Sequence, residues 1–172
     1  MKRWILGTGV CLTVLAACSR DDDGSTGNEV NDNDRNFVTM ASLSNNAEVA
    51  AGQIAATKGS NALVKTFGQQ MVSEHTAAQA DLKSRASALS LTAPDTVDAE
   101  HKALAVRLNS LSGYSFDTAY MNAQIRDHGK TVDIFKTEVN GGNNQSIRGY
   151  AVDYLPHIQM HYNKADSIRK LL

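Results

Sequence analysis

The sequence has very few cysteines from which disulfide bonds could form. Only two of its 172 residues are cysteines, Cys11 and Cys18, and only two are prolines. A small fold that depends on disulfide bonds needs several paired cysteines, so that class of protein is excluded. The fold must be stabilised by packing, or by packing together with a metal ion.

The sequence also lacks an excess of charge of either sign. It has 17 lysine and arginine residues against 18 aspartate and glutamate residues, for a net charge of −1. Without a basic patch, no nucleic-acid partner is expected. A Gly-x-Ser-x-Gly elbow and a glycine-rich phosphate loop, which are typical of nucleophilic and phosphate chemistry, do not occur either. These absences favour a protein that is not an enzyme.

The one long hydrophobic run lies at the N-terminus. Lys2 and Arg3 precede the apolar residues 4–14, and the run ends in Leu15-Ala16-Ala17-Cys18. This pattern predicts a secretory signal at residues 1–17, too short for a spanning helix. Leu-Ala-Ala-Cys resembles a bacterial lipobox, which implies cleavage before Cys18, lipidation of that residue with palmitate-like chains, and a membrane anchor. The alternative is an ordinary signal in which Cys18 has no role.

Residues 18–35 have almost no apolar content and are rich in glycine, serine, asparagine and aspartate. We expect a flexible acidic tether there, since such a segment cannot bury enough surface to fold. The acidic run at residues 21–23 resembles the surface-export signal of Bacteroidetes lipoproteins. It favours the cell envelope, at the outer membrane, on its periplasmic or surface-exposed side. The alternative is that these aspartates are simply solvated linker.

Beyond the tether, apolar residues recur at intervals of three and four, which is typical of helices. We predict an all-α domain over residues 36–172, a four-helix bundle in which residues 90–114 cross over and include a short helix. Pro156 predicts a kink near residues 153–155. The expected helices span about 36–58, 61–89, 95–111, 116–139 and 145–172.

Polar residues interrupt the apolar stripes of the long helices. These are Glu48, His75, His128 and His161. Each could be a core residue with a hydrogen-bond partner. Together, three imidazoles and a carboxylate could bind zinc, copper or iron.

Further polar candidates lie near these four. Glu74 and Asp127 could be hydrogen-bond partners of the histidines, and Tyr120 a core aromatic. His157 comes level with His128 when depth is counted at about 1.5 Å per residue, which predicts a tightest cluster of His128, His157 and His161. A di-iron carboxylate centre needs Glu-x-x-His on two helices, and the sequence has none.

Several motifs occur in an order that resembles a known family. They include Val64-Lys65-Thr66-Phe67-Gly68, Met71-Val72-Ser73-Glu74-His75-Thr76, Asp127-His128 and Leu155-Pro156-His157-Ile158-Gln159-Met160-His161. The chain from residue 36 to the C-terminus is similar to the bacterial "domain of unknown function 4142" family. The resemblance implies a ferritin-like helical bundle, often in secreted proteins or lipoproteins, and no assigned reaction. The family's motif positions fall on Glu48, Met71, His75, Phe116, Asp117, Tyr120, Asp127, His128, Pro156 and His161.

The sequence therefore predicts an envelope lipoprotein with a ferritin-like helical domain, anchored to the membrane by its lipid and present as a monomer or homodimer. Its expected role is non-catalytic binding or stress-related accessory function. The alternative is a metal-binding protein or a metal-dependent enzyme that uses the buried histidines and Glu48.

Overall fold

The computed structural model describes Met1 and residues 28–172. The expected signal peptide, the lipidation site Cys18 and the tether up to residue 27 lie outside the described residues. Within the described part, the chain forms five helices and no strand, which confirms the all-α prediction. They are α1 Asp32–Lys58, α2 Ala62–Ala88, α3 Ala99–Ser110, α4 Gly113–Gly141 and α5 Gln145–Leu171. No helix of this part is long and apolar enough to cross a membrane.

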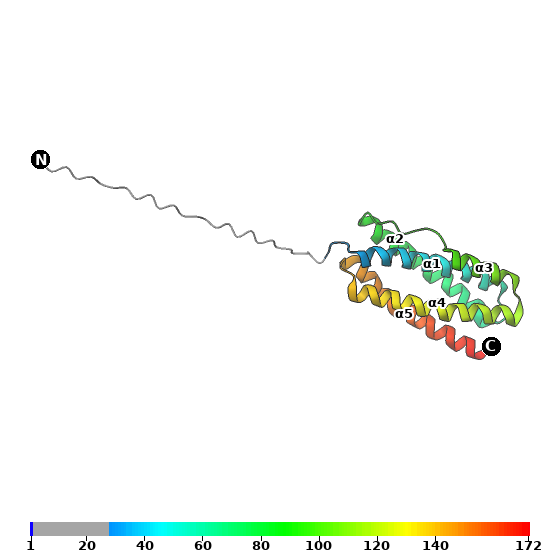
Figure 1. Cartoon of the computed structure of the whole chain (residues 1–172). Coiled ribbons are helices and arrows are strands. Elements are labelled where there is room, and N and C mark those ends of the chain that lie inside the picture. The colour runs from blue at the N-terminus through cyan, green and yellow to red at the C-terminus, as the bar shows by residue number, and fades with distance from the viewer. Residues whose placement is uncertain (2–27) are drawn as a thin grey trace.

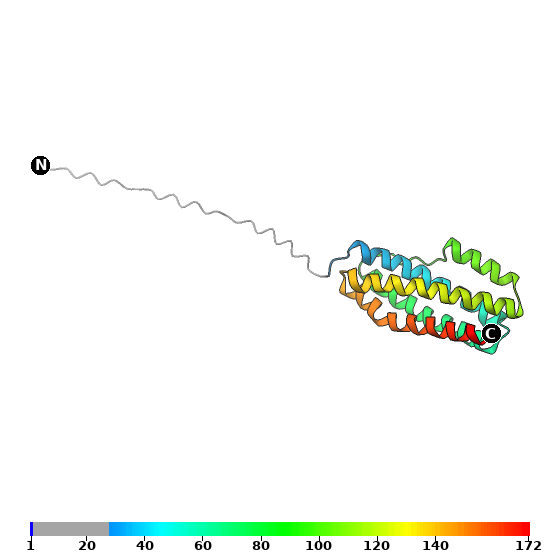
Figure 2. The ribbon, with the colours of Figure 1, turned by 60° about the horizontal axis from the view of Figure 1, so that its bottom comes forward.

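Four long helices form the bundle, and the short helix α3 lies outside it (Figures 1 and 2). The closest packing is within the hairpins α1–α2 and α4–α5, while α1 also faces α4 and α2 faces α5. The segment between the hairpins carries α3, which packs on α1 and α4. The predicted bundle with a short crossover helix is confirmed, and the described chain enters the bundle at the end opposite its C-terminus.

Helix α1 begins at Asp32, four residues before the expected start at Asn36. The cause is a capping box. The Asn31 Oδ1 atom accepts a hydrogen bond from the backbone N–H of Asp34 (2.9 Å), and Asp34 Oδ2 accepts one from the backbone N–H of Asn31 (2.7 Å). Residues 32–35 therefore belong to the domain and not to the tether, because reciprocal capping satisfies the first N–H groups of the helix.

Other helix starts also differ from the expected ones. Helix α2 is capped by Asn61, and α4 begins at Gly113, before the expected Phe116. Helix α3 starts only at Ala99, where the Asp98 side chain accepts the backbone N–H of His101. Helix α5 runs unbroken through Pro156, so the proline does not end it. Pro156 has no N–H to donate to the carbonyl of Val152, four residues earlier. Val152 is 52% exposed, so water can bond to that carbonyl instead.

The core consists of two hydrophobic clusters, one toward each end of the bundle. The first contains Phe37, Leu82, Phe135, Ile147 and Tyr150, among others. The second contains Phe67, Met71, Phe116, Tyr120 and Met121, among others. Buried polar side chains of all four long helices lie between them in sequence, at Asn45, Glu48, His75, Gln124, His128 and His161. The middle of the bundle is thus a polar layer between two apolar ones.

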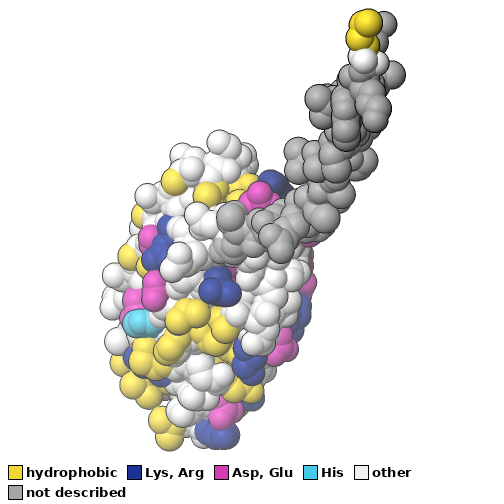
Figure 3. All heavy atoms as spheres, turned by 90° about the vertical axis from the view of Figure 1, so that its left-hand side faces the viewer, with side chains coloured by type: hydrophobic (Ala, Val, Ile, Leu, Met, Phe, Trp, Pro, Cys, Tyr) yellow, Lys and Arg dark blue, Asp and Glu magenta, His cyan; other side chains and the backbone are white. Residues whose placement is uncertain are grey.

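The surface carries charges of both signs. Figure 3 shows the end of the molecule from which the N-terminal segment leaves, where basic, acidic and hydrophobic side chains are interspersed. The exposed large hydrophobic residues are distributed over several helices and include Met40, Leu63, Val106, Tyr114 and Met160. Single apolar residues of this kind are ordinary on protein surfaces.

Candidate functional site

Three histidines from three helices meet in the polar layer. They are His75 on α2, His128 on α4 and His161 on α5, and each is at most 2% exposed. One ring nitrogen of each lies within 4.8 Å of the other two. Their ring centroids are 5.4 to 5.7 Å apart. Among the described residues, no carboxylate or further histidine joins this group.

One nitrogen of each ring is engaged by a different acceptor. His75 Nδ1 is 2.9 Å from the Asn45 side-chain oxygen, and His128 Nδ1 is 3.0 Å from the Gln124 backbone carbonyl. His161 Nε2 is 2.7 Å from a Glu74 carboxylate oxygen. The Asn45 amide nitrogen donates to Tyr150 at 3.1 Å, so its oxygen is the atom that faces His75. These acceptors assign the proton of each neutral imidazole to the engaged nitrogen.

The second nitrogen of each ring has no hydrogen-bond partner in the described part of the chain. These atoms are His75 Nε2, His128 Nε2 and His161 Nδ1, and all three are buried. Because the proton of each ring is on its engaged nitrogen, each of these atoms carries a bare lone pair. Buried polar atoms without partners are uncommon and cost about 1–3 kcal/mol each. Histidine with one nitrogen bonded to an acceptor and the other free is the arrangement of metal ligands.

Burial keeps the three histidines neutral at neutral pH. It lowers the pKa of His75 well below its usual value, and the nearby His128 and His161 lower it further. Burial lowers the pKa of His128 to about 4, although its bond to the Gln124 carbonyl opposes the shift. Burial and His128 also lower the pKa of His161, against the effect of Glu74. Neutral imidazole is the form that binds metal ions.

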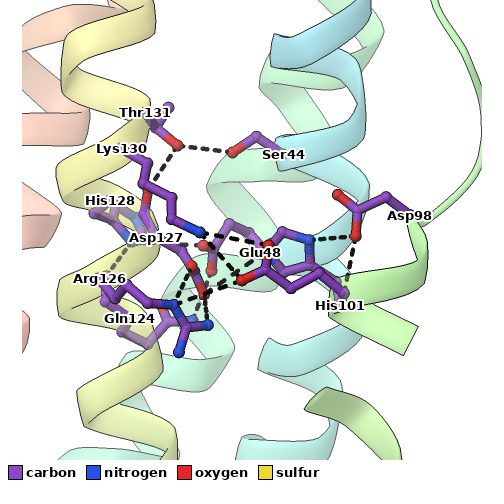
Figure 4. Close-up of polar contacts among 11 residues, drawn as sticks. Ser44, Glu48, Asp98, His101, Gln124, Arg126, Asp127, His128, Lys130 and Thr131 are labelled. Carbon is purple, nitrogen blue, oxygen red and sulfur yellow. Dashed lines mark hydrogen bonds and ion pairs between the residues drawn. The ribbon is translucent and has the colours of Figure 1, made fainter. Parts of the chain in front are cut away.

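Glu48 lies behind His128 and not among the free nitrogens. Its carboxylate accepts a hydrogen bond from Gln124 Nε2 at 2.8 Å, and its other oxygen is 3.5 Å from His128 Nδ1 (Figure 4). Burial raises the pKa of Glu48 to about 7, although the bond from Gln124 opposes this. Glu48 is therefore placed to orient His128 and to balance charge near it, not to complete the three-histidine group.

The expected cluster of His128, His157 and His161 is wrong in one member, since His75 takes the place of His157. The side chain of His157 is exposed on α5, whereas His75 is buried. Glu74, expected as a possible hydrogen-bond partner of a histidine, is hydrogen-bonded to His161. Tyr120 is a fully buried core residue of the second cluster, and its hydroxyl has no partner among the described residues.

Asp127 points away from the three histidines, toward α3. It accepts two hydrogen bonds from Arg126, both 2.9 Å long, and lies 3.7 Å from His101 Nε2. Figure 4 shows this outer network beside Glu48 and His128. His101 also contacts Asp98 at 2.8 Å, and the two carboxylates raise its pKa to about 9. No role for His101 was expected from the sequence, and in the structure it joins α3 with α4.

Sequence reasoning missed Asn45 and Gln124, which lie at buried positions of α1 and α4. The available signal was their position, since an amide at a core position of a helix needs a buried partner. The Asn45 side-chain oxygen and the Gln124 backbone carbonyl, together with the Glu74 carboxylate, are the acceptors bonded to the three histidines.

A cavity of about 310 Å³ opens between α2 and α5. His75 and His161 form part of its wall, and Glu74, His157 and the 45% exposed Met160 also line it. The remaining lining residues are mainly apolar or aromatic, and include Ala77, Ala78, Tyr150, Tyr154 and Ile158. Two of the three histidines therefore contribute to the wall of this cavity, and His128 does not.

Comparison with known proteins gives a family and a fold. Residues 21–168 match the family described as domain of unknown function (DUF4142). The bundle is similar to the crystal structure of a DUF305 fragment from Deinococcus radiodurans, with a TM-score of 0.72 at 10% identity, over 83% of this chain and 99% of that one. At that identity the likeness concerns the fold alone. No curated protein is significantly similar to the chain.

Proposed function

Because this chain belongs to the DUF4142 family of domains of unknown function, we infer its function from its own site and propose that His75, His128 and His161 bind one transition-metal ion. The observation that carries the proposal is that three buried imidazoles each bring one nitrogen within 4.8 Å of the others, and that one nitrogen of each ring has no hydrogen-bond partner among the described residues. One ion would satisfy all three nitrogens at once.

Zinc is the ion that we expect first. Zinc accepts imidazole nitrogens at about 2.0–2.1 Å, which in a tetrahedral site brings the nitrogens to about 3.4 Å from one another. The required movement from the present spacing is small for side chains. Copper also suits imidazole, whereas iron sites in helical bundles use several carboxylates, which this group does not contain. Glu74 and Glu48 are placed to balance the charge of a divalent ion.

The test is metal-dependent stability. An ion that binds only the folded state stabilises it by mass action, so zinc should raise the melting midpoint of the purified chain. At an ion concentration one hundred times the dissociation constant, the gain is about 2.7 kcal/mol. Replacing His75, His128 or His161 by Gln should remove most of that gain. Melts with zinc, copper and iron, together with elemental analysis of protein purified without chelator, measure it.

His101→Gln is the matched control, because it removes a partly buried histidine whose side chain contacts the carboxylates of Asp98, which caps α3, and Asp127 of α4. Its melting midpoint should still rise with zinc. If no ion moves the midpoint of the unaltered chain and the protein contains no metal, the histidines are packing residues of an accessory domain and the proposal is refuted.

We also propose that the domain acts at the cell envelope, anchored by lipid on Cys18. The support is the Leu15-Ala16-Ala17-Cys18 sequence after a short apolar run. Cys18→Ser should yield a soluble or unprocessed protein that takes up no labelled palmitate. Continued incorporation of palmitate by that variant would contradict the anchor.

A further inference from the structure

The cavity between α2 and α5 lies where the bundle is most loosely packed. Of the four pairs of neighbouring long helices, α2 and α5 are in the least extensive contact. Helix α2 contributes Ala77 and Ala78 to this face, and their methyl groups leave space that a larger side chain would fill. Voids larger than a water molecule are uncommon between packed helices. The two helices therefore leave room for a small molecule between them.

The cavity has the volume of a small organic ligand. It measures about 310 Å³. An apolar cavity of about 150 Å³ is enough for benzene, and pockets that bind small molecules begin at about 300 Å³. A single molecule of one or two fused rings therefore fits this space.

Aromatic rings and a thioether form much of the wall. The Tyr150 and Tyr154 rings are stacked with their centroids 4.4 Å apart, and the His157 ring is 6.2 Å from that of Tyr154. Met160 lines the cavity and is 45% exposed, and Ile158 adds an aliphatic surface. Aromatic rings attract further rings by offset stacking or edge-to-face contact, and thioethers also contact rings favourably. The wall is therefore complementary to an aromatic ligand.

The polar groups of the wall are already bonded to one another. The Asn45 amide nitrogen donates to the Tyr150 hydroxyl, and the Asn45 side-chain oxygen is bonded to His75. The Glu74 carboxylate is bonded to His161, and no lysine or arginine is among the described lining residues. The free nitrogens of the two histidines are buried, so a ligand in the cavity cannot reach them. A charged ligand would lose hydration without gaining a partner, which favours an uncharged one.

We propose that this cavity binds a small uncharged aromatic molecule of one or two fused rings. The ligand lies against the rings of Tyr150 and Tyr154 and contacts Met160. Burial of its apolar surface supplies most of the affinity. The inference does not rest on the proposed metal, because every contact that it uses is with the cavity wall and none is with a free histidine nitrogen.

The experiment uses indole as the probe and the full chain kept free of metal by a chelator. With ¹³C in the methionine methyl groups, the Met160 resonance should shift as indole is added, with a dissociation constant of about 1 mM or less. Met121, which is buried in the second apolar cluster outside this cavity, should not shift. Indole at ten times its dissociation constant should raise the melting midpoint by about 3–6 °C. Benzoate and benzylamine, which carry a charge, should bind at least about tenfold more weakly.

Two variants locate the site. Ala77→Trp, at an exposed position that lines the cavity, should fold but lose most of the indole binding, because the new ring takes up the space. Tyr154→Leu, which keeps the wall apolar but removes a ring, should also weaken binding. Ala80→Trp is the matched control, at an exposed position of α2 outside this cavity, and should bind indole as the unaltered chain does.

The inference is overturned if indole moves neither the Met160 resonance nor the melting midpoint. It is also overturned if the charged probes bind as tightly as indole, or if Ala77→Trp and Ala80→Trp bind indole equally well. None of these outcomes bears on the three-histidine site, which the melts with zinc, copper and iron test separately.

Discussion

A single buried carboxylate, Asp34, joins the start of α1 to the turn between α4 and α5. It accepts hydrogen bonds from the backbone N–H groups of Asn31 at 2.7 Å, Asn143 at 3.4 Å and Asn144 at 3.1 Å. Glu138 is 1% exposed beside it, and its two oxygens have no donor among the described residues. Burial, and then the neighbouring Asp34, raise the pKa of Glu138 to about 8. Glu138 is therefore protonated in the folded protein at neutral pH.

Glu138→Gln should make the fold less sensitive to rising pH. The pKa of Glu138 is raised from 4.5 to about 8 on folding, so the folded state binds more protons between these values. Its stabilising effect is complete below about pH 4.5 and is lost as pH rises through 8. Raising the pH from 5 to 9 should therefore lower the free energy of unfolding of the unaltered chain by about 1–3 kcal/mol more than that of the variant.

Urea unfolding at both pH values measures the difference. Glu29→Gln, at an exposed position, is the control and should not alter the pH dependence. Glu48 titrates in the same direction in both proteins, so the comparison between variants isolates Glu138. Equal slopes of stability against pH for Glu138→Gln and the unaltered chain would contradict this account.

At the scale of helices, α1 and α2 approach closely through a pair of glycines. A Cβ atom added to Gly52 would lie 2.8 Å from the Gly68 backbone oxygen, and one added to Gly68 would lie 2.8 Å from the Gly52 oxygen. Backbone atoms cannot move away without separating the helices. The first hairpin therefore depends on the absence of side chains at these positions.

Gly52→Ala should destabilise the domain by about 1–3 kcal/mol, because the clash outweighs the better helix propensity of alanine. Gly129→Ala, in the middle of α4, is the matched control. Its Cβ would meet only Tyr162 at 3.5 Å, an ordinary contact, so that variant should be neutral or more stable by up to about 1 kcal/mol. Chemical unfolding of both variants tests this, and equal effects at the two glycines would refute it.

The short helix α3 has little buried apolar surface, since Leu108 is its one buried residue. Its attachment to the bundle depends also on polar contacts. His101 reaches Asp127 of α4 at 3.7 Å, and Glu100 pairs with Lys130 at 3.1 Å. The second pair is solvent-exposed, and exposed pairs contribute little. The buried side of the network, at His101 and Asp127, is the part that matters for stability.

His101→Gln should cost about 1–2 kcal/mol at pH 7 and less at high pH. The carboxylates of Asp127 and Asp98 raise the pKa of His101 from 6.5 to about 9. Its stabilising effect is complete below pH 6.5 and is lost as pH rises through 9. In the unaltered chain, backbone hydrogen exchange should also be faster in α3 than in α1. Lys130→Gln, which breaks only the exposed pair, should change stability by less than about 1 kcal/mol. A His101 effect of the same size at pH 7 and pH 10 would contradict the assignment.

At the scale of the whole molecule, the polar layer couples the two hairpins. His75 belongs to the first hairpin, and His128 and His161 to the second, so one ion would link both. In the absence of an ion, two separate apolar clusters stabilise the bundle on either side of the layer. The domain should therefore fold without metal and become more stable with it.

Residues 28–172 should fold alone, because the five described helices of that range supply the residues of two extensive apolar clusters. Far-UV circular dichroism of this fragment should show a mostly helical spectrum with a cooperative melt, and sedimentation should give a monomer or a homodimer. Its melting midpoint should be within a few degrees of that of the whole chain. A fragment with substantial strand content, or with no cooperative transition, would contradict the domain boundary.

Much of this fold could be predicted from the sequence because its signals are local. Apolar residues at intervals of three and four located the long helices, and Gln145 was expected and found as the start of α5. Helix starts were less accurate where the cap lies in a polar segment that carries no apolar period. Helix α1 begins four residues before its expected start, after the Asn31 cap, and α3 begins four residues after its expected start, after Asp98.

The candidate site, like the fold, could be predicted from the sequence only in part. The sequence by itself determined that histidines occur on the apolar stripes of α2, α4 and α5, because helical periodicity decides which face a residue occupies. Only the tertiary structure decided that His75 joins His128 and His161, that His157 remains outside, and that Glu48 lies behind His128. The physical reason is that the rotation and relative height of packed helices follow from side-chain interdigitation across the whole core, which no single helix encodes.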